Sequence, residues 1–180
     1  MKKVLSVGVL ALTTGLLPAS TLQQLSLTDM TLKSTAIVRG RLTFASMALR
    51  GDIIYTHYSL TVTEVWKGVA AAQIDVAVPG GYANGAHQTF AGAPAFVNGQ
   101  DYLLFLWTSK TGLTQVIGLS QGIFTLIPNA PGSASDPLAV RVAISEPMVN
   151  SSGVITTSGS FQMLLSALRA QVQTTLGSAK

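Results

Sequence analysis

The sequence predicts a mainly β protein in which a small barrel carries a short helix at its N-terminal end and an amphipathic helix at its C-terminal end. Residues 53–68 alternate between apolar and polar side chains over a much longer stretch than the usual strand of about 5–6 residues. Residues 102–108 are almost continuously apolar, as expected for a strand buried on both faces. A strand as long as 53–68 normally curls, as the strands of small barrels do, so these patterns together favour a barrel.

The first residues, MKKVLSVGVLALTTGLLPAS, have the pattern of a secretory signal peptide. Lys2 and Lys3 precede an apolar run that is short for a membrane span, and Pro18 and Ala19 provide a small-residue cleavage site of bacterial type. We therefore expect a signal peptide over residues 1–19 and a single domain over 20–180, secreted or periplasmic. The alternative is an uncleaved membrane anchor; after cleavage we expect no stable membrane span.

Charge is scarce in this chain and is not clustered. Charged residues make up 10% of the 180 residues, and loss of Lys2 and Lys3 leaves nine basic side chains against seven acidic ones, a formal charge of +2. Without a run of Lys or Arg to follow phosphates, nucleic-acid binding is not expected. The chain has no cysteine, so an exported domain would depend on its hydrophobic core without disulfides.

The N-terminal half is expected to begin with a helix and continue as strands. Residues 25–35 predict the helix, where Ser26 and Asp29 have the spacing of a capping box. A strand over 36–45 has Gly40 inside it, which marks a bulge or tight bend. The further expected elements are a turn over 48–52, the long strand over 53–68 with a bulge near Glu64, and a strand over 73–79.

The second half is expected to form more strands and then the helix. A glycine-rich excursion over 80–99, with a hairpin over 86–91 and a turn at 98–99, precedes strands over 102–108, 113–119 and 123–127. Residues 138–144 predict a further strand, and 149–159 an irregular segment. Apolar side chains on one face predict a helix over 161–176 that Ser158 or Ser160 caps: Phe161, Leu164, Leu165, Leu168 and Val172.

The stretch GLSQG, residues 118–122, fits the G-x-S-x-G pattern of a hydrolase nucleophile elbow. An elbow places its serine between a strand and a helix, whereas IFTLIP after this stretch is typical of a strand. We therefore interpret Gly118 and Gly122 as flanking a kink or bulge that joins two antiparallel strands. The serine hydrolase remains as the alternative, with Ser120, Asp101 and either His57 or His87 available in the order of a triad.

No cofactor or metal site is predicted. The two histidines are 30 residues apart, the carboxylates are scattered without ligand spacing, and His57 is expected to be a solvated strand residue. No convergent pair of acids suggests glycoside hydrolysis. VPGGYANG, residues 78–85, lacks the Lys-Ser or Lys-Thr of a phosphate-binding loop and is not followed by a helix pattern.

The glycine-rich excursion has two interpretations, a flexible connection between strands or a binding site. It brings polar and aromatic side chains to a loop on a rigid barrel, where recognition residues are often found. The predicted binding residues are Tyr82, Asn84, His87, Gln88 and Phe90.

Five motifs, IVRGRL, YTHYSLTVTEVWKG, VPGG, NGQDYLLFLW and GLSQGIFTL, resemble those of a set of uncharacterised secreted bacterial proteins, and their order is similar to that of the netrin-like (tissue-inhibitor-of-metalloproteinase-like) domain. The resemblance covers residues 26–127 and implies an OB-type five-stranded barrel with a packed helix. Inhibitors of that family chelate a protease zinc ion through an N-terminal cysteine, which this chain lacks, so only the protein-binding barrel carries over.

These observations predict an exported, non-enzymatic binding module. Its expected partner is a protein, with a secreted protease as one case, or a cell-surface polymer. A serine hydrolase that uses Ser120 and a structural cell-envelope protein are the alternative hypotheses.

Overall fold

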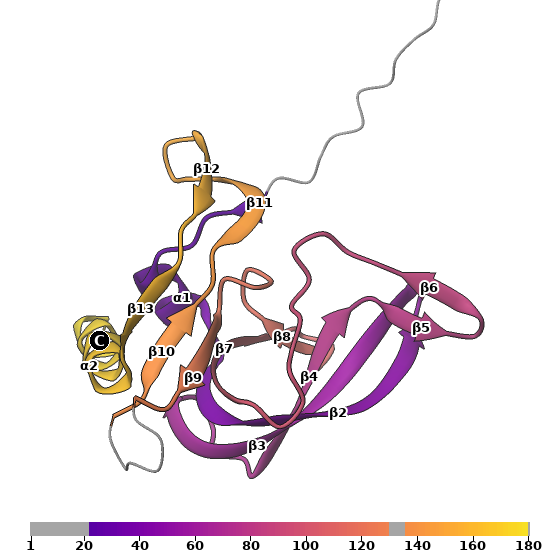
Figure 1. Cartoon of the computed structure of the whole chain (residues 1–180), viewed down its shortest axis with the longest axis horizontal. Helices are drawn as coiled ribbons and strands as arrows, with labels where there is room; N and C mark the ends of the chain where they lie inside the picture. Colours follow the sequence, from indigo (N-terminus) through magenta and orange to yellow (C-terminus); the bar gives the residue numbers. More distant parts are fainter. Residues whose placement is uncertain (1–21, 130–135, 180) are drawn as a thin grey trace, which may run out of the picture.

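A computed structural model describes residues 22–129 and 136–179 of the chain (Figure 1). The expected signal peptide over 1–19 lies outside the described residues. The two helices are α1 (Leu27–Lys33) and α2 (Leu165–Ser178), and most other described residues are in strands, so the mainly β class is confirmed. No described helix is both long enough and apolar enough to cross a membrane.

One large antiparallel sheet organises the fold, in the order β13-β10-β9-β7-β2-β3-β4, with β8 also paired to β7. Its strands are β2 (Ala36–Arg50), β3 (Ile53–Lys67), β4 (Gln73–Pro79), β7 (Asp101–Thr108), β8 (Thr114–Val116), β9 (Ile123–Ile127), β10 (Leu138–Arg141) and β13 (Phe161–Leu164). A smaller sheet joins β1 (Leu22–Gln23), β11 (Ile144–Val149) and β12 (Ile155–Ser158), with β1 parallel to β11. A separate hairpin pairs β5 (Gly81–Ala83) with β6 (Ala86–Gln88).

The large sheet has a buried cluster on each face. On one face the two helices cover a cluster that includes Phe105, Phe124 and Leu168. On the other face the curled strands enclose Leu42, Leu60 and Leu104. Because β7 contributes to both clusters, its near-continuous apolar sequence is explained, and the prediction of a strand buried on both faces is confirmed.

The curl of the sheet brings its two halves together without a hydrogen-bonded closure. β4 and β8 lie beside each other (Figure 1). No sheet among the described residues closes on itself through a ladder, so the predicted OB-like barrel is not confirmed.

β2 and β3 form one long, bulged ribbon. The register shifts between Ile37 and Val38 and again between Arg39 and Gly40, and on β3 these two shifts lie on either side of Glu64. The predicted bulges at Gly40 and near Glu64 are therefore confirmed. A third shift lies between Phe44 and Ser46. The predicted turn over 48–52 is too long, because residues 48–50 still pair with 53–55 and only Gly51 and Asp52 turn.

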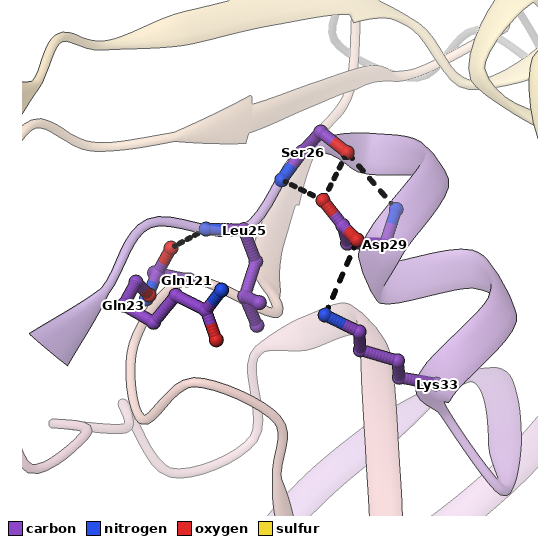
Figure 2. Close-up of polar contacts among 6 residues, drawn as sticks. All are labelled: Gln23, Leu25, Ser26, Asp29, Lys33 and Gln121. Carbon is purple, nitrogen blue, oxygen red and sulfur yellow. Dashed lines mark hydrogen bonds and ion pairs between the residues drawn. The ribbon is translucent and has the colours of Figure 1, made fainter. Parts of the chain in front are cut away.

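Helix α1 is fixed at both ends by polar contacts. At its start the Ser26 Oγ accepts from the Asp29 amide at 3.0 Å, and the Asp29 carboxylate accepts from the Ser26 amide at 3.2 Å, so the capping box is confirmed (Figure 2). At its end the Lys67 ammonium donates to the carbonyls of Thr31 and Leu32, both at 2.8 Å. These bonds satisfy helix groups that have no partner within the helix.

The next residue, Gly68, lies where the β3 exit passes the start of β2. Its φ is +94°, and a Cβ there would come within 2.8 Å of the Thr35 carbonyl oxygen. Lys67-Gly68, a motif of the family resemblance, therefore has a local structural role in joining β3 to α1 and β2.

The C-terminal region departs most from the sequence predictions. The segment expected as a helix over 161–176 begins with strand β13 and becomes helical only at Leu165. Residues 161–164 pair with β10, and this ladder overrides their helical periodicity. The strand expected over 138–144 ends at Arg141, and the segment expected to be irregular over 149–159 contains β12.

The start of α2 is not capped by Ser158 or Ser160. Its N-cap residue is Leu164, which has no side-chain acceptor. The Asp136 carboxylate instead accepts from the Ser166 amide at 3.1 and 3.3 Å, and the Pro137 carbonyl accepts from the Leu165 amide at 2.9 Å. The capping function therefore comes from a segment 30 residues earlier in the chain.

Candidate functional site

The glycine-rich excursion folds as a hairpin at the tips of β2 and β3, on the opposite side of the molecule from α2 (Figure 1). Its turn is Asn84-Gly85, with φ of +50° and +77°, as a type I′ hairpin turn requires. The hairpin predicted over 86–91 is therefore placed too late in the chain. The predicted turn at Asn98-Gly99 is confirmed.

The five predicted binding residues divide into two groups. Asn84 forms the turn, and Gln88 fixes the hairpin to the ribbon, accepting from the Ile54 amide and donating to the Asp52 carbonyl, both at 2.7 Å. Tyr82, His87 and Phe90 are exposed, and the rings of Tyr82 and His87 stack at 4.1 Å. Asn84 is exposed as well, so of the five only Gln88 has its side chain engaged by the protein itself.

Large apolar side chains surround this hairpin. We call six of them, each 39–67% exposed, the apolar rim: Phe44, Met47, Leu49, Tyr82, Phe90 and Val97. In the β2–β3 register Phe44, Met47 and Leu49 face Tyr58, Thr56 and Ile54, alternate residues of β3, so they share one face of the ribbon. That face is also the face of Leu42 and Leu60, so the rim continues the inner core toward solvent.

One contact joins two rim residues, and another joins the rim to the core beside it. The Phe44 ring lies 6.2 Å from the Tyr58 ring, and the Tyr82 amide lies 3.2 Å from Met47 Sδ. Tyr58 and Phe90 line a cavity of about 220 Å³ beneath the hairpin. Burial, with a smaller contribution from Tyr102, raises the pKa of the Tyr58 phenol, which is consistent with its position at the wall of this cavity.

GLSQG forms a loop between β8 and β9, which both pair with β7. β8 and β9 run in the same direction along β7, so the expectation that this stretch joins two antiparallel strands is wrong. Phe105 bridges the loop: its carbonyl accepts from Ile117 and its amide donates to Gly122, both at 2.9 Å. The stretch is thus an excursion from a single interrupted strand, and the strand expected over 113–119 is limited to 114–116. The prediction that a strand follows GLSQG is confirmed by β9.

The GLSQG loop directs the Gln121 side chain toward the protein interior. The Gln121 side chain is 2% exposed, accepts from the Leu25 amide at 2.8 Å and donates to the Gln23 carbonyl at 2.9 Å (Figure 2). It therefore binds the backbone of the segment before α1 as a neighbouring strand would. The sequence analysis singled out Ser120 and missed Gln121.

The residues considered for a catalytic triad have separate partners. His57 Nδ1 lies 2.8 Å from Asp75, Asp101 pairs with Arg41 at 3.0 Å, and His87 stacks on Tyr82. Within the described part of the chain, no hydrogen bond links Ser120 to a histidine or a histidine to Asp101. The sequence analysis missed the contact between His57 and Asp75, which the pairing of β3 with β4 creates.

A larger cavity, of about 380 Å³, lies near the start of α1. Segments far apart in the sequence line it, including Leu25, Met30, Phe124, Arg141, Asn150 and Phe161. The volume is in the range of small-molecule sites. The sequence analysis did not predict this site, because its lining residues come from separate elements.

Arg141 is the cation of this cavity. Its guanidinium carbon lies 5.6 Å from the centres of both the Phe124 and the Phe161 rings. The β10–β13 register places Arg141 opposite Phe161, and the β9 register, continued by one residue, places it opposite Phe124. Burial lowers the pKa of Arg141, but an arginine remains charged at neutral pH. The sequence contained one indication that Arg141 is buried: side chains alternate along a strand, so Arg141 lies on the same face as the buried Ala139.

In residues 22–129 and 136–179, no group of three or more His, Cys, Asp or Glu side chains gathers to hold a metal ion. Comparisons of the chain with protein-family models, curated proteins and solved structures gave no match.

Proposed function

We propose that this protein is an exported, non-enzymatic binding module and that its partner is another protein. The observation that carries the proposal is the apolar rim, in which six large apolar side chains are exposed on one face of the β2–β3 ribbon and the adjoining excursion. Monomeric proteins rarely expose large apolar patches, and such patches often mark interaction sites.

The low charge around the rim favours a protein over a charged polymer as the partner. Arg41 and Asp101 neutralise each other at 3.0 Å, and the Arg50 side chain donates to the Thr111 carbonyl at 3.0 Å. An aromatic and methionine-containing surface is typical of protein interfaces. Stacked Tyr82 and His87 add a polar, aromatic edge to it.

The strand path supports the netrin-like, OB-type arrangement that the motifs imply. Along β4-β3-β2-β7-β8 the sheet curls until β4 and β8 lie beside each other, and an OB-fold is a partly open five-stranded barrel. Barrels of this type bind ligands on one face and its bordering loops, and an apolar rim on the β2–β3 ribbon and the adjoining loop is consistent with such use. Export and the secreted or periplasmic location rest on the signal-peptide pattern alone.

The proposal is tested by affinity capture with matched variants. The immobilised protein is exposed to secreted and periplasmic fractions of its source organism, beside a rim variant (Phe44→Ser with Leu49→Ser) and a control (Val154→Ser with Ile155→Ser). The control removes exposed apolar side chains at the start of β12, away from the rim. Circular dichroism establishes that all three are folded.

We expect a protein retained at near-equal molar amounts by the unchanged chain and the control, and at least about tenfold less by the rim variant. Light scattering on the purified pair measures the stoichiometry. A peptidase assay, with and without this protein, establishes whether the partner is a protease and whether binding inhibits it. Equal retention by all three chains, or only polysaccharide on the column, would contradict the proposal.

A further inference from the structure

We propose a second, separate binding site: the cavity at Arg141 binds the carboxylate of a small organic acid whose apolar body lies among Leu25, Leu27 and the Phe161 ring. This site does not depend on the proposed function, because it lies on β9, β10 and β13 near α1, whereas the apolar rim lies on β2, β3 and the glycine-rich excursion.

The first argument is the incomplete hydrogen bonding of the guanidinium. The Nε atom of Arg141 is buried, and no described group of the protein accepts its hydrogen. Its Nη1 reaches only the Gln121 carbonyl, at 3.5 Å. A guanidinium with so few acceptors is costly, so a carboxylate that pairs with it from the cavity would gain charge-assisted hydrogen bonds.

The second argument is the missing countercharge. Among the described carboxylates, none lies within ion-pair distance of Arg141. The carboxylate that lines the same cavity, Asp29, is already engaged by Ser26 at 2.6 Å and by Lys33 at 3.2 Å (Figure 2). The cavity therefore has an unpaired positive charge at one wall.

The third argument is that the guanidinium is held in place. The Phe124 and Phe161 rings both lie 5.6 Å from its carbon, and the strand register sets their positions. Such packing fixes the planar group and reduces the entropy lost when a carboxylate pairs with it. Arginine presents two parallel N–H groups that match a carboxylate in geometry.

The lining sets the class of ligand. Leu25, Leu27 and Phe161 are half-buried and offer apolar surface beside the cation. Asn150 offers a side-chain amide whose oxygen already accepts from the Ser152 and Val154 amides, each at 2.9 Å. A ligand with one anionic end and an apolar body satisfies both parts of the cavity.

The test measures binding at the arginine itself. The Nε–H resonance of Arg141 is followed by two-dimensional ¹H–¹⁵N NMR while the purified protein is titrated with acetate, hexanoate or 3-phenylpropionate. The neutral 3-phenylpropanol, which has the same apolar body, is the ligand control. Isothermal titration calorimetry supplies Kd values.

Two variants separate charge from geometry. Arg141→Met keeps an unbranched apolar stem between the rings, and Arg141→Lys keeps the charge but not the paired N–H groups. Arg39→Met, on β2 and outside the cavity lining, is the protein control. Thermal unfolding establishes that each variant is folded before it is titrated.

We expect 3-phenylpropionate to shift the Arg141 Nε–H resonance and to bind at least about tenfold more tightly than the alcohol. Arg141→Met should weaken its binding at least about tenfold, Arg141→Lys by less, and Arg39→Met should leave it unchanged. Equal binding of acid and alcohol, unchanged binding by Arg141→Met, or a resonance that no carboxylate shifts would each overturn the proposal.

Discussion

Gln121 holds the backbone at Leu25 with the two ends of one side-chain amide: its oxygen accepts from the Leu25 amide at 2.8 Å, and its nitrogen donates to the nearby Gln23 carbonyl at 2.9 Å. Its own backbone is turned into position by the GLSQG excursion, in which Leu119 has a φ of +59°. A motif that resembles a nucleophile elbow therefore positions a glutamine that connects β9 to the segment before α1.

The contrast between Gln121→Ala and Ser120→Ala tests this role. Gln121→Ala leaves a buried amide and a carbonyl without their partners, and we expect a loss of about 2–3 kcal/mol in the free energy of unfolding. Ser120→Ala should change it by less than about 0.5 kcal/mol, as is usual for partly exposed side chains without a special role. Urea denaturation measures both, and an equal effect of the two substitutions would contradict the role of Gln121.

Gly68 should be the less replaceable of two glycines with positive φ. At Gly68 (φ +94°) an added Cβ meets the Thr35 carbonyl oxygen at 2.8 Å, whereas at Gly51 (φ +61°) it meets nothing within 4 Å. We expect Gly51→Ala to cost about 1 kcal/mol of backbone strain and Gly68→Ala at least about 2 kcal/mol, because a steric clash is added. Thermal unfolding of the pair measures the difference, and equal costs would show that the chain relaxes freely at Gly68.

The start of α2 should depend on Asp136 and not on the serines that precede the helix. Asp136→Ala removes the acceptor of the Ser166 amide and the negative charge at the helix start, which should destabilise the protein by about 1 kcal/mol. Ser160→Ala should have no measurable effect. Chemical denaturation measures the stability, and exchange of the Ser166 amide with deuterium reports the local effect; slow exchange in Asp136→Ala would contradict the capping role.

Asp29 should make the stability depend on pH in the acid range. Hydrogen bonds from Ser26 and then from Lys33 lower the pKa of its carboxyl below the ordinary value of 3.8. A carboxyl with a lowered pKa in the folded state stabilises the fold above its unfolded pKa, and this contribution is lost as the pH falls through the folded value. The window therefore lies below about pH 4.

Asp29→Asn is expected to lose roughly 0.5–1 kcal/mol at pH 7, a modest figure because the carboxylate is exposed and screened by solvent. The difference from the unchanged chain should shrink as the pH falls below about 4 and the carboxyl becomes protonated. Asp52→Asn, at the exposed β2–β3 turn, is the control. Denaturation curves at several pH values measure both, and a difference that stays constant across the acid range would rule out ionisation as the cause.

Local patterns predicted much of the first half of the fold. The Ser26 and Asp29 spacing predicted the start of α1, alternation predicted β3 and β4, and the continuous apolar run predicted β7. These features depend on residues near one another in the chain, so the sequence contains the information directly. Gln88, one of the predicted binding residues, shows the limit of this approach, because its anchoring role became visible only with the hairpin in place.

By itself the sequence determined the class of fold, the capped first helix, the bulges of the β2–β3 ribbon and the strand after GLSQG. Only the tertiary structure decided that residues 161–164 are a strand, that Asp136 caps α2, that Gln121 binds the Leu25 backbone and that Arg141 lies between Phe124 and Phe161. Periodicity and capping spacing arise from local backbone geometry, whereas these contacts join residues 17 to 96 positions apart and form only when the sheet assembles in its register.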